Sequence, residues 1–327
     1  MGGYADEGMK NVLKNLYRLL DCPARIQVRM LTPIAAVRGI PDLRVWDPDI
    51  IHYLGGPTYL SGIILYVLRR MLDNPKVMLS LIHPNLGLGG GFLLRSVPVN
   101  VCLTESQQWH KWAQNNNLDA KCMSQSGVDV QRFSPVTGAD KVVLRSELGL
   151  PANRYVVLHV GHIKEDRNLR LLCALQREGS LQVVIVGSTA TRVEEPLLMD
   201  LRDSGCIVNI GFAPKIEQYY QAADCYVFPT THTQAAIQIP LSILEAMATN
   251  LPVVSTSFGG LKDFFTSGEG LTFVDRSEMG NLTAIVLRAV KCESVRTRAN
   301  VMGFAWEVVA QRLIRLYVDL LNQRNAS

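Results

Sequence analysis

A single carboxylate, Glu245, lies in the apolar stretch PLSILEAMATNLPVVSTSFGG, residues 240–260. A carboxylate in such surroundings must be hydrogen-bonded, because leaving a buried polar group unpaired costs on the order of several kcal/mol. The two hydroxyls of a sugar, such as a nucleotide ribose, would satisfy it, and so would backbone amides at the start of a helix. Residue type and place therefore make Glu245 a candidate for binding a polyol.

The same stretch ends on the loop SFGG, residues 257–260, between an apolar strand pattern and the helix start LKDFF. Gly259 and Gly260 would let backbone N–H groups approach a ligand closely, and the start of a helix carries a partial positive charge. The loop predicts an anion site, for phosphate above all. A tight turn between strand and helix, with no ligand, is the alternative interpretation.

A second strand followed by a glycine occurs in VLHVGHIKEDRNLRLL, residues 157–172, with Gly161 at the strand end. Three cations follow it, Lys164, Arg167 and Arg170. A guanidinium can hold a diphosphate through two parallel hydrogen bonds. We assign that role to Arg167 and interpret Lys164 and Arg170 as solvated residues at a helix start.

Length, net charge and cysteine pattern limit the number of domains, the kind of partner and the cellular compartment that we expect. The chain has 327 residues, about enough for two domains of ~150 residues. Its net charge of +4 comes without a basic block, which argues against a nucleic-acid partner and is compatible with an anionic small molecule or an anionic membrane surface. The 7 cysteines form no C-x-x-C pair, so we expect a reducing compartment and no zinc site.

Targeting and membrane-spanning segments are not expected. The start of the chain, MGGYADEGMK, is polar and lacks the features of a signal peptide. The apolar run LSGIILYVL, residues 60–68, is too short to span a bilayer, which takes ~20 residues. We therefore predict a cytoplasmic protein, whose only membrane contact would be peripheral and made by the N-terminal domain.

Strand and helix patterns alternate along the chain. The strand candidates are 25–31, 50–54, 76–83, 99–104, 121–127, 155–161, 181–187, 206–211, 225–230, 252–257 and 271–275. The helix candidates between and after them include 143–148, 164–178, 214–223, 241–249, 279–291 and 304–321. Most strand candidates are continuously apolar, as strands covered on both faces are. We expect an α/β fold with two doubly wound parallel sheets.

The polar, turn-rich segment 127–140 marks a boundary between the two sheets. We predict an N-terminal Rossmann-like domain over 1–134, a C-terminal one over 135–303, and a returning helix over 304–327. Ligands of open parallel sheets bind beyond the carboxyl ends of the strands, so a cleft between two such sheets is the expected site. The residues that directly follow strands are His83, Thr104, Glu105, Gly161, His162, Gly187, Ser188, Pro229, Gly259 and Gly260.

Four segments carry a resemblance to a known family. GVDVQRFSP, VLHVGHIKEDRNLRLL, YYQAADCYVFPT and PLSILEAMATNLPVVSTSFGGLKDF resemble, in order and spacing, the retaining glycosyltransferases of family four (glycosyl transferases group 1). The similarity covers about residues 76–321. It implies the GT-B fold, a nucleotide-sugar donor on the second domain, acceptor contacts mainly from the first, and transfer with retention of configuration.

The resemblance also implies roles for individual residues. Glu245 matches the second glutamate of the family's E-x7-E motif, which binds the donor ribose, and Arg167 matches a lysine that contacts the diphosphate. His83 matches a histidine beside the transferred sugar. The implied catalytic set is His83, Arg167 and Glu245. The implied donor-binding set is Gly3, Gly161, His162, Arg167, Gly187, Ile237, Leu241, Glu245, Gly259 and Gly260.

Three positions depart from the family pattern. Ile237 stands where the first glutamate of E-x7-E belongs, and His162 stands where an arginine is usual. Gly2 and Gly3 match a double glycine that should follow a first strand, and that strand is not evident. Without an acid at 237, the donor sugar would be held by backbone groups and by neighbours such as His232, Thr233 or Gln234.

We expect a hexosyltransferase of glycan, polysaccharide or glycoconjugate synthesis that uses neither a metal ion nor a cofactor. Its acceptor would be a glycan, a lipid-linked sugar or a small molecule, contacted by the glycine-rich loop 83–94. One alternative is a degenerate homologue that binds a nucleotide or a partner without turnover, and another is a nucleotide-sugar epimerase. The sequence argues against a dinucleotide oxidoreductase, because no strand candidate leads into G-x-G-x-x-G.

Overall fold

The computed structural model describes residues 8–22, 25–55, 59–84, 99–189 and 191–322. The chain divides into two compact units. The six-strand unit holds residues 1–11 with 127–305, and the four-strand unit holds residues 12–126 with 306–327. The sequence placed the boundaries at 134 and 303 and assigned residues 1–11 to the N-terminal domain, whereas they cluster with the six-strand unit.

The six-strand unit is built on one parallel sheet with the strand order β10-β9-β8-β5-β6-β7. Its strands are β5 (Tyr155–Gly161), β6 (Leu181–Gly187), β7 (Ile207–Ile210), β8 (Cys225–Phe228), β9 (Val253–Thr256) and β10 (Leu271–Val274). Every residue of β6, β8 and β9 is buried. Continuous burial on both faces is what an all-parallel sheet with helices on each side requires.

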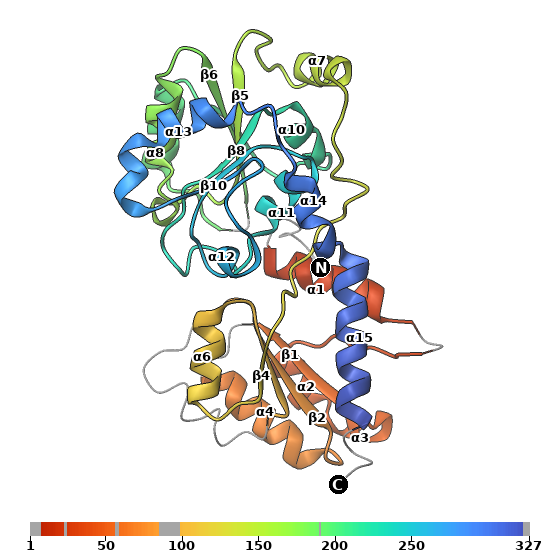
Figure 1. Cartoon of the computed structure of the whole chain (residues 1–327). Helices are drawn as coiled ribbons and strands as arrows, with labels where there is room; N and C mark the ends of the chain where they lie inside the picture. The colour runs from red at the N-terminus through yellow and green to blue at the C-terminus, as the bar shows by residue number, and fades with distance from the viewer. Residues whose placement is uncertain (1–7, 23–24, 56–58, 85–98, 190, 323–327) are drawn as a thin grey trace. The chain divides into compact units, whose positions relative to one another are not determined.

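Helices cover both faces of this sheet (Figure 1). α8 (Arg170–Gln176) and α13 (Leu282–Ala289) lie on one side, and α10 (Ile216–Ala222), α11 (Leu241–Ala248) and α14 (Thr297–Val301) lie on the other. The remaining helices of the unit are α7 (Gly138–Glu147), α9 (Glu195–Asp203) and α12 (Leu261–Phe264). A buried apolar cluster lies under α8 and α13, where Leu172, Ile185 and Val286 are fully buried.

The four-strand unit has a parallel sheet in the order β1-β2-β3-β4. Its strands are β1 (Ile50–Gly55), β2 (Lys76–Leu81), β3 (Val101–Thr104) and β4 (Ala120–Cys122). Its helices are α1 (Gly8–Leu20), which begins in the other unit, α2 (Pro33–Arg38), α3 (Ile40–Trp46), α4 (Tyr59–Met71), α6 (Gln107–Asn115) and α15 (Trp306–Asn322). Both units thus confirm the predicted α/β fold with two parallel sheets.

The strand predicted over residues 25–31 is wrong. Within this segment, all of which the structure describes, Ile26 alone pairs, in an isolated antiparallel bridge to Cys22. The chain then runs on without a ladder until Thr32 caps α2, accepting a hydrogen bond from the Ala35 backbone N–H, with Pro33 at the first helical position. The segment has strand-like residues, yet no described strand lies beside it to complete backbone hydrogen bonds.

α15 is attached to the four-strand sheet by a partly buried series of hydrogen bonds. The His52 Nδ1 atom lies 2.7 Å from the Tyr317 hydroxyl, and its Nε2 atom lies 2.6 Å from the Ser80 hydroxyl. Burial lowers the pKa of His52 to about 3. The imidazole is therefore neutral and offers one donor and one acceptor, which the two hydroxyls can match.

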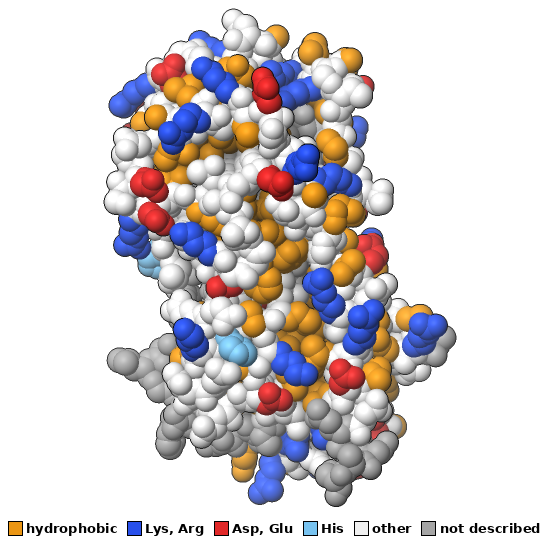
Figure 2. Space-filling model, in the orientation of Figure 1, with side chains coloured by type: hydrophobic (Ala, Val, Ile, Leu, Met, Phe, Trp, Pro, Cys, Tyr) orange, Lys and Arg blue, Asp and Glu red, His pale blue; other side chains and the backbone are white. Residues whose placement is uncertain are grey.

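Charges of both signs are interspersed on the face of the molecule that Figure 2 shows. Across the residues that the structure describes, no helix is long and apolar enough to cross a membrane. The predicted acceptor loop, residues 83–94, falls outside the described residues except for its first two.

Candidate functional site

The candidate site is built at the carboxyl ends of β5 and β6, where Gly161 and Gly187 face each other in register. A Cβ atom on Gly161 would collide with the Arg167 Nη1 atom and would lie 3.4 Å from the His159 Nε2 atom. A Cβ atom on Gly187 would lie 2.7 Å from the Ile163 Cδ1 atom. The two glycines therefore make room for the loop that carries Arg167 across the strand ends.

Arg167 ends the 3-10 turn η1 (Glu165–Arg167) and is only 6% exposed. Its Nη2 atom donates a hydrogen bond of 2.7 Å to the Ala235 carbonyl oxygen. Its Nε atom is buried and has no hydrogen-bond partner among the described residues. Burial lowers the pKa of Arg167, but a guanidinium stays charged in proteins. A buried cation with an unused donor at strand ends is suited to an anionic ligand.

Two further buried polar atoms of this unit lack a partner among the described residues, His159 Nε2 and Thr230 Oγ1. The Nδ1 atom of His159 lies 2.9 Å from the Val227 carbonyl oxygen, so it must carry the proton. Burial, with the nearby Arg167 charge, lowers the pKa of His159 to about 4. His159 is therefore neutral, and its Nε2 atom is a hydrogen-bond acceptor pointing toward the position that Gly161 leaves open.

Glu245 lies in the middle of α11, whose first residue is Leu241. Its Oε2 atom accepts a hydrogen bond of 2.7 Å from the Tyr220 hydroxyl. Its partner is thus a side chain of α10 and not the amides of a helix start, the alternative that the sequence left open. Burial raises the pKa of Glu245 to about 7, despite this hydrogen bond.

Arg167 and Glu245 act on a common neighbour. Burial raises the pKa of Tyr226 on β8, a hydrogen bond with Ser242 and the Arg167 charge oppose this rise, and the Glu245 charge adds to it. The Tyr226 hydroxyl donates to the Val160 carbonyl oxygen at 3.4 Å. The Tyr220 and Tyr226 rings are 5.7 Å apart. The cation and the carboxylate therefore belong to one neighbourhood, bridged by two tyrosines.

In the loop 257–260, packing against Gln238 explains why glycine is needed at position 259. Gly259 has φ +54°, and a Cβ atom there would overlap the Gln238 carbonyl group. The Gly260 N–H donates a hydrogen bond of 3.0 Å to the same carbonyl oxygen. The following helix, α12, has only 4 residues. Close packing of two loops thus requires Gly259 with or without a bound anion.

The other predicted residues are distributed as follows. Ile237 is 8% exposed, and its Cδ1 atom would lie 3.6 Å from a Cβ atom on Gly8. The His162 Nδ1 atom lies 3.1 Å from the Thr191 hydroxyl. His83 is half-buried, two residues after β2, and belongs to the four-strand unit. Gly3 lies outside the described residues.

A cavity of about 450 Å³ opens beyond β7 in the six-strand unit. Phe212, Lys215 and Tyr219 line it, and the Gly211 N–H donates a hydrogen bond of 3.1 Å to the Gly187 carbonyl oxygen. The cavity therefore lies at the same edge of the sheet as Gly161 and Gly187. Its aromatic lining was not anticipated from the sequence.

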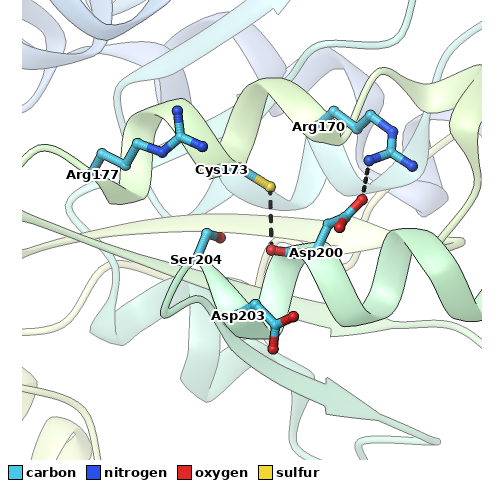
Figure 3. A pocket seen from close by; sticks show the side chains of 6 residues that line it. All are labelled: Arg170, Cys173, Arg177, Asp200, Asp203 and Ser204. Atoms are coloured by element: carbon cyan, nitrogen blue, oxygen red, sulfur yellow. Dashed lines mark hydrogen bonds and ion pairs between the residues drawn. The ribbon is translucent and has the colours of Figure 1, made fainter.

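A second cavity, of about 600 Å³, lies between α8 and α9 and is lined by Arg170, Cys173, Arg177, Asp200, Asp203 and Ser204 (Figure 3). Arg170 is paired there with Asp200 and also with Glu165. It is exposed, which agrees with a solvated helix-start residue. The groove is larger than the cavity beyond β7, but it follows two helices instead of the strand ends, so we do not place the site in it.

A metal centre is not evident in the part of the chain that the structure describes, where no group of three or more His, Cys, Asp or Glu residues could hold an ion. Asp47 and Asp49 have D-x-D spacing, but both are exposed and Asp47 is the left-handed cap that ends α3.

Sequence reasoning missed His159, Thr230 and Tyr220. A histidine inside the apolar run VVLHV was a usable signal, because an ionisable group in a covered strand needs partners. Nothing in the sequence connects Tyr220 with Glu245, since 25 residues separate them and they meet only through α10 and α11.

Residues 154–291 match the family described as "Glycosyl transferases group 1". A GDP-mannose-dependent alpha-mannosyltransferase of Mycobacterium tuberculosis is 23% identical over an alignment that covers 94% of this chain and 83% of that protein. A D-inositol 3-phosphate glycosyltransferase of Mycobacteroides abscessus is 35% identical over 58% of this chain and 44% of the relative. The chain thus spans about half the length of the inositol 3-phosphate glycosyltransferases it matches.

Solved structures show the fold over nearly the whole chain. Sucrose-phosphate synthase from Thermosynechococcus elongatus has a TM-score of 0.71 at 20% identity and covers 93% of this chain and 83% of its own. An Anabaena protein solved in complex with UDP-glucose has a TM-score of 0.74 at 16% identity, covering 98% of both chains. The two parallel sheets and these solved structures show the GT-B fold, and residues 154–291, less than half of the chain, are similar to glycosyl transferases group 1.

Proposed function

We propose that the protein is a glycosyltransferase that moves a hexose-type sugar from a nucleotide-sugar donor to a glycan, lipid-linked or small-molecule acceptor. The observation that carries the proposal is Arg167, a buried guanidinium with an Nε atom that has no partner among the described residues, at the carboxyl ends of β5 and β6. The names of the relatives support it, because they are glycosyltransferases or a sugar-phosphate synthase. One similar structure was solved with UDP-glucose.

The diphosphate, the ribose and the base of a nucleotide sugar each have a matching group in the six-strand unit. Arg167 would bind the diphosphate. Glu245 would accept hydrogen bonds from the ribose hydroxyls in addition to the one from Tyr220. The cavity beyond β7 would hold the base, since Phe212 and Tyr219 offer flat apolar surfaces for stacking.

The chemistry requires stabilisation of a leaving group above all. When the bond between the anomeric carbon and the diphosphate breaks, negative charge develops on the phosphate oxygen. A fixed cation and N–H donors aimed at that oxygen stabilise the transition state without reorganising. We propose a same-face mechanism, in which the leaving phosphate takes the proton of the acceptor hydroxyl as the new glycosidic bond forms. Configuration is then retained, and neither a protein nucleophile nor a metal ion takes part.

The proposal is tested with a panel of UDP-, GDP- and ADP-sugars, using donor hydrolysis and nucleoside diphosphate binding as readouts. Arg167→Gln should weaken binding of the diphosphate by at least about tenfold, because removing one partner of a desolvated charge pair costs ~2–5 kcal/mol. Arg170→Gln is the matched control, since Arg170 is exposed and paired with Glu165 and Asp200. Equal affinity of the Arg167→Gln variant and the parent would contradict the site.

A second candidate function, nucleotide binding without turnover, is favoured by Ile237. Its side chain is nearly buried and apolar where the family places an acid. Ile237→Glu should change the hydrolysis rate or the preferred donor by more than about tenfold, because one hydrogen bond formed or lost in a buried site is worth ~1–3 kcal/mol. If neither parent nor variant hydrolyses any donor while both bind nucleotide, the binding function replaces the enzymatic one.

A further inference from the structure

His159 is a fully buried histidine on β5, two residues before the glycine that ends the strand. Its ring stacks on the Tyr226 ring, with centroids 6.3 Å apart, and lies 6.2 Å from the Phe228 ring. Its Nδ1 N–H donates to the Val227 carbonyl oxygen at 2.9 Å. These contacts fix the place of the ring and its tautomer, so the Nε2 atom is a hydrogen-bond acceptor in a fixed position.

The His159 Nε2 atom and the Arg167 guanidinium border the same small space beside Gly161. A Cβ atom at Gly161 would lie within 3.4 Å of Nε2 of His159 and of both Nη1 and Cζ of Arg167. One small polar group at that point would therefore contact both side chains. Burial lowers the pKa of His159 to about 4 and the Arg167 charge contributes to the lowering, which agrees with the two groups being neighbours.

The lone pair on Nε2 needs a hydrogen-bond donor, and it has none among the described residues. The diphosphate of a nucleotide sugar is the wrong partner, because phosphate oxygens are acceptors and a lone pair repels them. Arg167 is the right one, since a guanidinium has five N–H donors. Within the described part of the chain, Arg167 uses one terminal nitrogen, Nη2, to bind the Ala235 carbonyl oxygen.

We propose that His159 positions Arg167 for the proposed transfer reaction. An Nη1 N–H of Arg167 donates to the His159 Nε2 atom, directly or through one water molecule beside Gly161. The guanidinium is then held at both terminal nitrogens, by Ala235 and by His159, and its Nε N–H is left for the diphosphate. The consequence for catalysis rests on the proposed function, whereas the contact forms without a donor.

A guanidinium that is held in place acts mainly in the transition state. A cation that must reorient while charge develops on the leaving phosphate stabilises that charge less than a fixed one does. Without the Nε2 acceptor, Arg167 would be attached through the Ala235 carbonyl oxygen alone. Loss of Nε2 should therefore lower both the affinity for a nucleoside diphosphate and the kcat of donor hydrolysis, although His159 touches neither the substrate nor the reacting atoms.

Two amide variants separate the ring nitrogens of His159. His159→Asn keeps an amide N–H for the Val227 carbonyl oxygen but has no atom at the Nε2 position. His159→Gln reaches the Nε2 position with an amide oxygen and gives up the hydrogen bond to Val227. Calorimetry uses whichever of UDP, GDP and ADP the parent binds best. The asparagine variant should bind at least about tenfold more weakly than the parent, and the glutamine variant about threefold or less.

A double-mutant cycle shows whether the effect passes through Arg167. In the Arg167→Gln background, His159→Asn should change the affinity by less than about twofold, because no guanidinium is left to position. Arg170→Gln provides the matched background, since Arg170 is exposed and pairs with Glu165 and Asp200. The full loss caused by His159→Asn should persist there.

Nitrogen NMR of the histidine rings tests the contact without any nucleotide. The chain has 6 histidines, and the Nε2 resonance of a neutral imidazole depends on whether that atom accepts a hydrogen bond. Arg167→Gln should shift the His159 Nε2 signal, whereas Arg170→Gln should leave it in place. The measurement keeps His159 itself intact, so it also covers the case in which the His159 variants fail to fold, which circular dichroism would show.

Four results would overturn the proposal: an unmoved His159 signal in Arg167→Gln, parent-like nucleotide affinity in His159→Asn, equal losses in the asparagine and glutamine variants, or a loss that persists in the Arg167→Gln background. A parent that binds none of the three nucleotides would contradict the proposed function, and the histidine signals would then decide the contact between His159 and Arg167 by themselves.

Discussion

At the scale of single residues, burial decides which groups carry charge at the strand ends. His159 is neutral because burial lowers its pKa to about 4, and Arg167 beside it remains a cation. Glu245 is the group whose charge state changes near neutral pH, since burial raises its pKa to about 7. Donor binding should therefore depend on pH through Glu245.

The direction of the pH dependence follows from the protonation state of Glu245 that binds the donor. Hydroxyls of a ribose donate to the carboxylate, so binding favours the ionised form of Glu245. Affinity for a nucleotide sugar should rise with pH through about 7 and level off above it. Between pH 8 and pH 6 the loss is expected to be about tenfold, because most of the carboxyl is protonated at the lower pH.

Calorimetry on the parent and on Glu245→Gln checks this prediction. A nucleotide sugar is the proper ligand, because its esterified diphosphate does not titrate in this range. The glutamine variant should bind more weakly at pH 8 and show a flat profile. A parent profile without slope, or an identical slope in the variant, would remove Glu245 from the donor site.

Glu105 is a buried carboxylate with a structural role, because it binds backbone N–H groups of its own unit. Its Oε1 atom accepts hydrogen bonds from the Gln125 N–H at 2.6 Å and the Ser126 N–H at 2.9 Å, with the Ser124 hydroxyl at 3.3 Å. These residues directly precede Gly127, where the chain enters the six-strand unit. Glu105 was a strand-end candidate, and its contacts show it holding the backbone of its own unit.

At the scale of elements, the attachment of α15 to the four-strand sheet depends on consecutive hydrogen bonds between side chains. Tyr317, His52 and Ser80 connect the helix with β1 and β2, and the His52 and Tyr317 rings meet edge to face at 5.7 Å. His52 is neutral and partly buried, so a lost partner would leave its Nδ1 atom without a hydrogen bond in a site with limited access to solvent.

Removing the Tyr317 hydroxyl should therefore destabilise the four-strand unit. Tyr317→Phe keeps the ring but leaves His52 Nδ1 without its partner, which costs ~1–3 kcal/mol. Urea unfolding of the variant measures the loss. Tyr155→Phe is the control, because Tyr155 lies at the exposed start of β5 in the other unit. A loss no larger than that of the control would show that α15 is held by apolar packing alone.

At the scale of the whole molecule, the positions of the four tryptophans allow fluorescence to distinguish one unit from the other. Trp46, Trp109, Trp112 and Trp306 all belong to the four-strand unit. The proposed nucleotide site belongs to the six-strand unit. Tryptophan fluorescence therefore reports on one unit, while the ligand acts on the other.

A nucleoside diphosphate that binds the six-strand unit should stabilise that unit by ~2.7 kcal/mol at 100 times its dissociation constant. Differential scanning calorimetry should then show one shifted transition, while the tryptophan fluorescence transition shifts less. Inorganic phosphate at the same concentration is the ligand control. Equal shifts by both methods would mean that the units unfold as one cooperative body.

The sequence by itself determined the class of fold and most of the elements. Runs of Val and Ile such as 181–187 and 252–257 predicted covered parallel strands, because a strand between two helix layers is apolar throughout. The segment 25–31 had similar residues and was mispredicted, because a strand also needs a neighbour that only the tertiary structure supplies.

For the candidate site, too, the sequence determined some features and the tertiary structure determined others. Sequence alone indicated Arg167, Glu245 and the glycines, because residue type and position after a strand are local properties. Only the tertiary structure decided their environment. It brought the Ala235 carbonyl to Arg167 and the Tyr220 hydroxyl to Glu245, and it left the Arg167 Nε atom buried without a partner among the described residues. Such contacts join helices and loops far apart in the chain, and their effect on pKa comes from burial, which no residue determines alone.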